Sequence, residues 1–270
     1  MRYSFLLSFG LLYTGCISTH QTTVNLNHPN YFILNSSIRI LDIDPLGNLY
    51  ITDGNDRLSK YDTTGQLLSY AVYNNLGRIH SLDVGNPFKT MLFYRDQQTI
   101  VLFDRTLSEI QRIRLSEWGL HDVTAVCLTP DNAIWLFDGL KKVLIKTNQS
   151  GDVVLASDPF DIIRPESQRP DLIYDADHLL LLKEEGYPLS VFDDFGKYIY
   201  TPDMIENENF SVSDQYVVMS SDSSVVLYDI TNRRLMPPMN LKDNLRRKRI
   251  YLFANHFYIS DDQGVYILYP

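Results

Sequence analysis

Several patterns that would identify a protein class are missing from this sequence. No long segment carries apolar residues at i, i+3, i+4 and i+7, so no helix is expected. There is no G-x-S-x-G, no glycine-rich phosphate loop, and no H-x-H or H-E-x-x-H spacing among the six histidines. These absences argue against a serine nucleophile on a strand-to-helix elbow, a phosphate-binding loop and a histidine-based zinc site.

Positive charge is also scarce. The 24 Lys and Arg residues are outnumbered by 33 Asp and Glu residues, which gives a net charge of −9. Nucleic acid is therefore not an expected partner, because its binding depends on neutralising phosphates. The one basic cluster, "RRKR", supplies the candidate partner-binding residues Arg246, Arg247, Lys248 and Arg249. It can face anionic headgroups, lipopolysaccharide phosphates or an acidic partner, but the pattern favours a solvated charge run at the start of a strand.

Aromatic residues, in contrast, are abundant. The chain has 18 Tyr and 13 Phe, with 44% hydrophobic and 21% charged residues, which are values typical of globular proteins. Tyr and Phe favour the half-buried surface of a pleated sheet. A length of 270 residues admits one repeat-built all-β domain as well as two ordinary domains.

The first sixteen residues, "MRYSFLLSFGLLYTGC", carry one basic residue, an apolar run, and small residues before Cys16. The apolar run is too short to span a bilayer and fits a cleaved export signal. Its ending at Thr14, Gly15 and Cys16 resembles a bacterial lipoprotein signal. This resemblance implies that residues 1–15 are removed and that Cys16 is acylated, with palmitate as one of its lipids. The alternative is a plain secretory signal with an incidental cysteine.

The lipoprotein resemblance also implies a cellular location. Ile17, not Asp, follows the cysteine, as in lipoproteins sent to the outer membrane of diderm bacteria, and no acidic surface-export run follows. We therefore expect an outer-membrane lipoprotein that faces the periplasm, with residues 16–22 as linker and 23–270 as the folded domain. Lipid on Cys16 would leave Cys127 without a disulfide partner. The run "DVTAVCLTP" predicts a buried, small hydrophobe at Cys127, with a reactive thiol as the alternative.

Internal repetition is the strongest signal in the chain. A short β-type run ends in an acidic residue at steps of 38 to 46 residues: Asp53, Asp96, Asp138, Glu184, Asp222 and Asp261. A second run follows each of these and keeps the same step, from "RLSKYD" to "GVYILY". Because both β-type runs recur at the same spacing along the chain, the sequence contains six copies of one structural unit.

Each unit also has a leading strand, such as "SIRILDID", and the first five have a trailing strand, such as "QLLSYAV". Four short strands in about 40 residues are typical of a propeller blade. The sequence therefore predicts an all-β fold, a six-bladed β-propeller with four-stranded blades. The sixth unit has no trailing strand, so a β-rich run at Val24–Leu26 or Tyr31–Leu34 is expected to complete it and to cover its sheet edge.

The first unit, "ILDIDPLGNLYITDGNDRLSKYDTTGQLL", resembles an NHL-type propeller repeat. The matching residues are Asp44, Gly47, Asn48, Tyr50, Asp53, Arg57, Lys60, Tyr61, Asp62 and Gly65. Only this unit, about a tenth of the chain, matches well. The resemblance strongly implies the propeller fold, but it does not indicate one particular function.

The recurring aspartates are best explained by turn chemistry. A carboxylate that closes a strand accepts backbone N–H groups of the following turn, and the glycines of these turns adopt positive φ at little cost. The segment "DGNDR", Asp53–Arg57, lacks the alternating ligands of a calcium loop and is expected to be a hairpin turn. Metal binding is the alternative for these acids.

One arrangement of acidic residues leaves a catalytic function as an alternative. Propeller lactonases of the gluconolactonase type hold calcium in the channel with acids and amides from several blades, and four acids here can converge in a comparable way: Asp83, Asp122, Asp175 and Asp214. The leading strands do not otherwise match that family, and turn aspartates produce the same ring without metal. We expect no cofactor, with calcium as the alternative. His80 and His121 are expected in loop or capping roles.

Two less regular segments complete the prediction. Residues Asp158–Asp171 are expected to form an extended connecting loop, and Met236–Arg249 is the preferred docking patch. The expected protein is an exported, lipid-anchored propeller that binds an envelope protein or membrane complex as a non-catalytic interaction scaffold. The alternatives are a metal-dependent lactonase or hydrolase with its site in the channel, and a sensor of small ligands or glycans.

Overall fold

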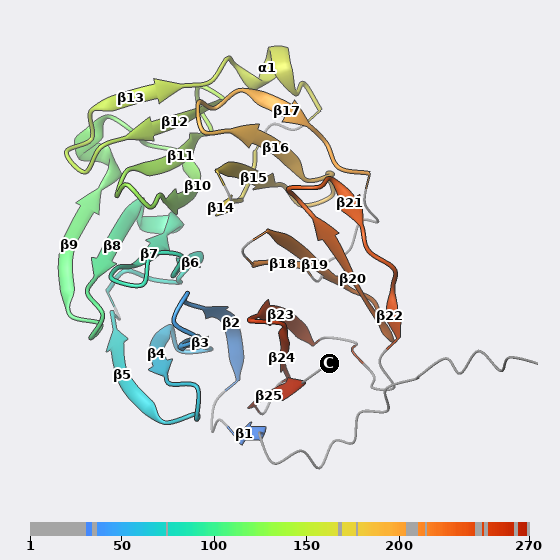
Figure 1. Cartoon of the computed structure of the whole chain (residues 1–270). Helices are drawn as coiled ribbons and strands as arrows, with labels where there is room; N and C mark the ends of the chain where they lie inside the picture. The colour runs from blue at the N-terminus through green and yellow to red at the C-terminus, as the bar shows by residue number, and fades with distance from the viewer. Residues whose placement is uncertain are drawn as a thin grey trace, which may run out of the picture.

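Six antiparallel sheets surround one axis (Figure 1), as the six sequence units predict. The computed structural model describes residues 31–33 by their backbone and residues 37–73, 75–166, 169–176, 178–203, 210–213, 215–240, 245, 248–261 and 264–268 with their side chains. Each of the six sheets contains the four-strand order that the repeats predict. The fold is a six-bladed β-propeller, and the prediction is confirmed.

The first four blades take their strands consecutively from the chain. Blade 1 comprises β2 (Ile38–Ile43), β3 (Leu49–Asp53), β4 (Arg57–Tyr61) and β5 (Leu67–Val72). Blade 2 comprises β6 (Ser81–Asp83), β7 (Thr90–Tyr94), β8 (Thr99–Phe103) and β9 (Glu109–Arg114). Blade 3 comprises β10 (Val123–Leu128), β11 (Ile134–Asp138), β12 (Val143–Thr147) and β13 (Val153–Ala156). Blade 4 comprises β14 (Leu172–Ala176), β15 (Leu179–Lys183), β16 (Ser190–Asp193) and β17 (Tyr198–Tyr200).

The outermost position of blade 5 is irregular. Its first three strands are β18 (Phe210–Ser213), β19 (Tyr216–Ser220) and β20 (Ser224–Asp229). Two short strands, β21 (Arg234–Leu235) and β22 (Met239–Asn240), both pair with β20 in place of one trailing strand. Pro237 and Pro238 lie between them. Because proline has no N–H for a sheet ladder, the trailing strand is divided there.

Blade 6 joins the two ends of the propeller. It contains β23 (Arg249–Phe253), β24 (His256–Ser260) and β25 (Gly264–Leu268), and its outermost strand is β1 (Tyr31–Ile33). Figure 1 shows β1 beside β25, and the register pairs Tyr31 with Tyr266. The expected closure by an upstream strand is confirmed. The other candidate run, Val24–Leu26, lies outside the described residues.

The innermost strands form a closed ring. Contacts run from β2 to β6, β10, β14, β18, β23 and back to β2. Apolar side chains fill each of the six layers between neighbouring blades. In the layer between blades 3 and 4, for example, Trp135 and Phe137 pack with Phe160 and Phe192. Alternate residues of a strand point to opposite sheet faces, so each blade contributes to two layers.

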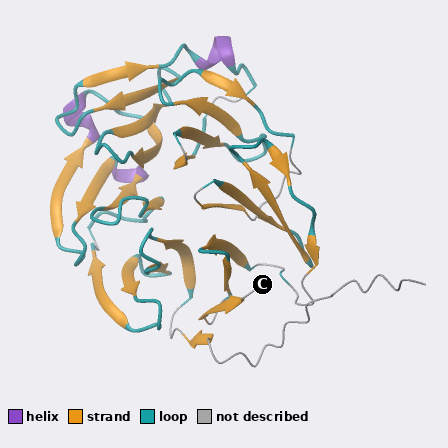
Figure 2. Ribbon diagram, in the orientation of Figure 1, coloured by secondary structure: helices purple, strands orange, loops and turns teal. Residues whose placement is uncertain are grey.

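Helical structure is minor in the described residues (Figure 2). It consists of α1 (Phe160–Ile163) and two 3-10 turns, η1 (Arg95–Gln97) and η2 (Leu115–Trp118). The segment expected to be an extended loop, Asp158–Asp171, thus contains one helical turn, in which Phe160 is buried against Phe137. Within the described part of the chain, no helix has the length and apolar character needed to cross a membrane.

Candidate functional site at the propeller axis

The innermost strands carry polar side chains at two levels of the axis. All six innermost strands begin at one level of the axis, which we call the start rim. They end at the other level, which we call the end rim. Hydrogen bonds between neighbouring blades fix both levels. The Val123 N–H, at the start of β10, donates to Gln98 Oε1 at 2.7 Å, and the Leu128 N–H, at the end of β10, donates to Asp83 Oδ2 at 2.7 Å.

Three carboxyl groups from different blades lie near the end rim. The Asp42 carboxylate accepts the Ile43 N–H at 2.9 Å, and Asp83 accepts the N–H groups of Gly85 and Leu128 at 3.0 and 2.7 Å. Burial raises the pKa of Asp42 to about 8, and the nearby charges of Asp83 and Asp44 add to the rise. Burial also raises the pKa of Asp83.

Asp175, on β14, belongs to the same group. Burial raises its pKa to about 6, and the negative charge of Asp83 is the next contribution. The carboxyl groups of blades 1, 2 and 4 are therefore close enough for their charges to repel. The end rim favours at least one protonated carboxyl group near neutral pH.

Two tyrosines lie between the rims. Tyr174 on β14 packs edge to face against Phe210, with ring centroids 5.8 Å apart. Burial raises the pKa of Tyr251, on β23, to about 12. Burial likewise raises the pKa of Tyr174, and the charges of Tyr251 and Asp42 contribute to that rise. Both phenols are therefore neutral at physiological pH.

Arginines gather at the start rim. Arg39, on β2, donates from Nη2 to Asp56 Oδ1 at 2.6 Å and from Nη1 to the Ile79 carbonyl at 2.7 Å. Burial lowers the pKa of Arg39, and the positive charges of Arg78 and Arg249 lower it further. A guanidinium nevertheless stays charged in proteins. The axis thus carries arginines, paired with carboxylates, where the strands begin, and carboxyl groups where they end.

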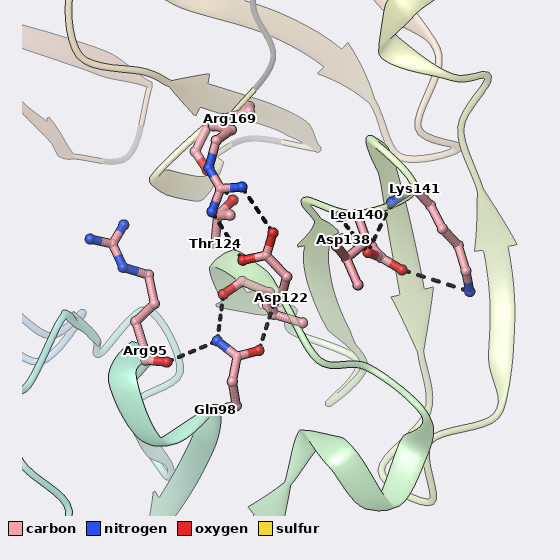
Figure 3. A network of polar contacts seen from close by, with 10 residues as sticks. Arg95, Gln98, Asp122, Thr124, Asp138, Leu140, Lys141 and Arg169 are labelled. Carbon is pink, nitrogen blue, oxygen red and sulfur yellow. Dashed lines mark hydrogen bonds and ion pairs between the residues drawn. The ribbon is translucent and has the colours of Figure 1, made fainter.

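The segment that leads into β14 crosses the start rim (Figure 3). Arg169 makes a two-pronged contact with Asp122, with Nη1 and Nη2 at 2.9 and 3.0 Å from the two carboxylate oxygens. The Thr124 hydroxyl donates to the Pro170 carbonyl. The Asp171 carbonyl lies 2.8 Å from Nε2 of His80 in blade 2, so this nitrogen carries the proton and donates. The segment therefore connects blade 4 with blades 2 and 3.

Gln98 completes the contacts at this rim. Its side-chain amide donates to the carbonyls of Arg95 and Val123 at 2.8 and 2.9 Å, while its carbonyl oxygen accepts the Val123 N–H. Burial lowers the pKa of His80, which keeps its imidazole neutral. His80 therefore has the structural loop role expected from the sequence. His121 is exposed.

The four predicted metal candidates do not share one level. Asp83 and Asp175 lie at the end rim, whereas Asp122 precedes β10 and pairs with Arg169 at the start rim. Asp214 lies outside the described residues. Among the described side chains, no three His, Cys, Asp or Glu residues are grouped so that they could hold a metal ion.

The basic cluster is only partly described. Lys248 Nζ donates to the Tyr266 hydroxyl at 3.1 Å, and Arg249 lies close enough to Arg39 and Tyr174 to influence their pKa values. Arg249 is thus placed near the axis. Arg246, Arg247 and the predicted lipidation residue Cys16 lie outside the described residues.

Sequence reasoning missed the polar residues of the axis itself: Arg39, Asp42, Tyr174 and Tyr251. Each interrupts an apolar leading strand, as in "SIRILDID" and "RIYLFAN". A polar residue inside an otherwise apolar innermost strand was the signal that could have found them.

The turn aspartates have the role that the sequence predicts. Asp53 accepts the N–H groups of Asn55 and Arg57 at 2.8 and 3.1 Å, and Asp62 accepts those of Thr64 and Gln66 at 2.9 Å each. The segment Asp53–Arg57 is the expected hairpin turn. These contacts confirm turn chemistry.

The NHL-like residues and Cys127 are also structural. Asp44 accepts hydrogen bonds from the N–H and side chain of Asn48, and its carboxylate lies 3.8 Å from the buried Lys60 ammonium. Gly47 has a φ of +84°, as the turn requires. Cys127 is buried, and burial raises its thiol pKa well above the usual value, which confirms a small hydrophobe.

Comparison with known proteins supports the fold. A streptogramin B lyase has a TM-score of 0.59 and 10% identity, over 88% of this chain and 95% of that one. Virginiamycin B lyase from Staphylococcus aureus has a TM-score of 0.57 and 12% identity, over 85% and 80% of the two chains. The WD40 domain of Neurospora crassa Pan2 has a TM-score of 0.53 and 13% identity, over 91% and 83%. At these identities the likeness shows the propeller fold alone.

Comparison by sequence gives no family. No protein-family profile matches the chain, and no curated protein matches it. The resemblance to NHL repeats therefore stays a resemblance of one blade.

Proposed function

We propose that this chain is an exported, lipid-anchored propeller that acts as a non-catalytic protein-protein interaction scaffold in the bacterial cell envelope. The start of the sequence supports export and acylation at Cys16, with the outer membrane facing the periplasm as the address. The propeller fold supports a binding role, because rigid blades present many loops on which partners can dock.

One observation carries the non-catalytic part of the proposal. Of the described candidate metal ligands, Asp122 lies at the start rim, away from Asp83 and Asp175, and two are already engaged: Asp83 with two backbone N–H groups and Asp122 with Arg169. A catalytic calcium ion needs six or more oxygen ligands around one point. Because the described acids offer no such convergence, they do not fit a calcium-dependent lactonase.

A small-ligand sensor is the second candidate, and the order of polar side chains along the axis favours it. Arginines lie at the start rim, neutral tyrosines lie between, and carboxyl groups lie at the end rim. A ligand with an acidic group at one end and an amine at the other would match this order.

The test is partner capture from native cells. Tagged wild-type chain would be crosslinked in its own cells and purified from the membrane fraction, with Cys16→Ser as the matched control. We expect one near-stoichiometric envelope protein with the wild type, and loss of membrane retention with Cys16→Ser. Failure to recover any reproducible partner would contradict the scaffold and direct attention to ligand binding at the axis.

A further inference from the structure

The outermost strands of two neighbouring blades differ in charge. β5 and β9 have six residues each and occupy the same position in blades 1 and 2. β9, "EIQRIR", carries Glu109, Arg112 and Arg114, and Arg112 pairs with Glu109 at 2.8 Å. β5, "LLSYAV", carries no charge. Charged residues on an edge strand prevent it from pairing with another chain, so β9 is protected and β5 is not.

β5 also exposes apolar side chains. Leu68, Tyr70 and Val72 retain 50%, 59% and 43% of their accessible surface, whereas Ser69 and Ala71 between them are half-buried. The three exposed residues alternate along the strand and therefore share one face. Among the described residues, no strand pairs with the outer edge of β5. An unpaired edge beside an apolar face is suited to the addition of another strand.

Charge at the two ends of β5 indicates which strand fits. At its end, Val72 pairs with Arg57, whose guanidinium lies 4.0 Å from the centre of the Tyr70 ring. At its start lies Asp62, whose pKa is lowered by hydrogen bonds from Thr64 and Gln66, so that it is ionised. The uncharged strand β5 thus has the positive Arg57 of β4 beside its end and the negative Asp62 of the preceding turn beside its start. An antiparallel copy of the same strand places each positive end beside a negative one.

We propose that β5 pairs edge to edge with β5 of a second copy of this chain, around a twofold axis at Tyr70. This register places Leu68 opposite Val72 of the second copy and joins the two apolar faces into one. The contact is isologous, so it closes as a dimer and does not propagate into a filament. A six-residue edge is small beside the roughly 1,600 Å² of a standard interface, and we expect a dimer that dissociates in the micromolar range.

Sedimentation equilibrium of the full chain carrying Cys16→Ser tests the proposal without a lipid. We expect a monomer-dimer equilibrium that Tyr70→Lys weakens at least about tenfold, because a lysine on the free edge opposes pairing. Ile110→Lys on β9 is the matched control and leaves dimerisation unchanged. Val154→Lys tests β13, a shorter uncharged edge on which Val154 is 58% exposed. A chain that stays monomeric at high concentration, or a dimer that Val154→Lys weakens as much as Tyr70→Lys, overturns the proposal.

A cysteine at the proposed twofold axis provides a second readout. In the Cys16→Ser background the remaining native thiol is Cys127, which is buried. Mild oxidation of a Tyr70→Cys variant is expected to give a disulfide-linked dimer, because the two copies of residue 70 face each other. Ile110→Cys gives none. Absence of the product from Tyr70→Cys, or equal yields from both variants, contradicts the proposed register. Capture of an envelope partner is independent of this result, so each proposal can fail without the other.

Discussion

The two rims of the axis differ in how their ionisable side chains are stabilised. At the start rim, charged side chains have partners of opposite sign: Asp122 pairs with Arg169, and Arg39 pairs with Asp56. At the end rim, three carboxyl groups have backbone N–H groups or one another as neighbours, and burial raises their pKa values. The comparison teaches that similar spacing of aspartates along the chain does not imply similar chemistry. The level at which each residue lies decides its charge state.

Among the changes that test this difference between the rims, replacement of Asp42 should have the largest effect on stability. The folded pKa of Asp42 is about 8, far above the value of about 3.9 for an unfolded chain. The folded state therefore binds more protons than the unfolded state between these values, and stability falls as pH rises from about 4 to 8. Asp42→Asn removes this loss and should raise the free energy of unfolding at pH 8 by several kcal/mol, because each unit of pKa difference corresponds to about 1.4 kcal/mol.

Urea unfolding at pH 5, 7 and 9 measures this effect. The gain from Asp42→Asn should grow with pH up to about 8 and then level off. Asp122→Asn, at the opposite rim, is the control and should show no comparable growth. A gain that is equal at all three values of pH would contradict the burial of a protonated Asp42.

Removal of the Asp83 carboxylate should be the next largest effect. Asp83→Ala leaves the N–H groups of Leu128 and Gly85 without their acceptor, which should cost about 2 kcal/mol. Asp83→Asn keeps one acceptor oxygen and should cost less. Thermal unfolding compares the two variants, and equal losses would show that hydrogen bonding to Leu128 in the next blade is not the cause.

A methyl group at Gly139 should disturb the start rim by crowding. A Cβ there would lie 2.7 Å from Asp122 Oδ2 and 3.0 Å from the Asp122 backbone oxygen. Gly139→Ala should therefore destabilise the chain by about 1.5 kcal/mol, because the backbone must shift. Gly85→Ala is the matched control, because Gly85 also lacks a positive φ and the nearest atom to its added Cβ lies at an ordinary 3.4 Å. Unchanged stability of Gly139→Ala would contradict the close approach of this turn to Asp122.

The ion pair of the start rim should contribute least. Arg169 is 58% exposed, so water screens its attraction to Asp122. A double-mutant cycle with Asp122→Asn and Arg169→Gln should give a coupling of about 0.5 kcal/mol, falling in high salt. A coupling above about 2 kcal/mol would show that the start rim is as well shielded as the end rim.

The blades could be predicted from the sequence because each strand repeats a local pattern. An apolar run that ends in an acidic residue and a turn recurs from Asp53 to Asp261, and each of these runs contains a strand. The missing trailing strand of blade 6 also predicted its closure by β1. The strand pattern depends on neighbours in the chain, which a sequence displays directly, and the closure follows from counting the strands of each unit.

The rims could not be predicted because spacing along the chain does not give the level along the axis. Asp83 and Asp122 are one repeat apart, yet Asp83 ends β6 while Asp122 precedes β10. The crossing of Arg169 to Asp122 depends on a connection whose path no periodic pattern encodes. The effect of Asp83 on both Asp42 and Asp175 arises only when blades 1, 2 and 4 are arranged around one ring.

The pairing of β1 with β25 has a consequence for synthesis. Tyr31 finds its partner only when Tyr266 has been made, at the far end of the propeller. At 5–20 residues per second, β1 waits on the order of ten seconds or longer after it leaves the ribosome. Blade 6 cannot assemble during this time, and its unfinished edge must be kept from other strands until the ring closes. Among the described strands, the closing of the ring is thus the one pairing that needs both ends of the propeller, and a chain without β25 would leave β1 without its partner strand.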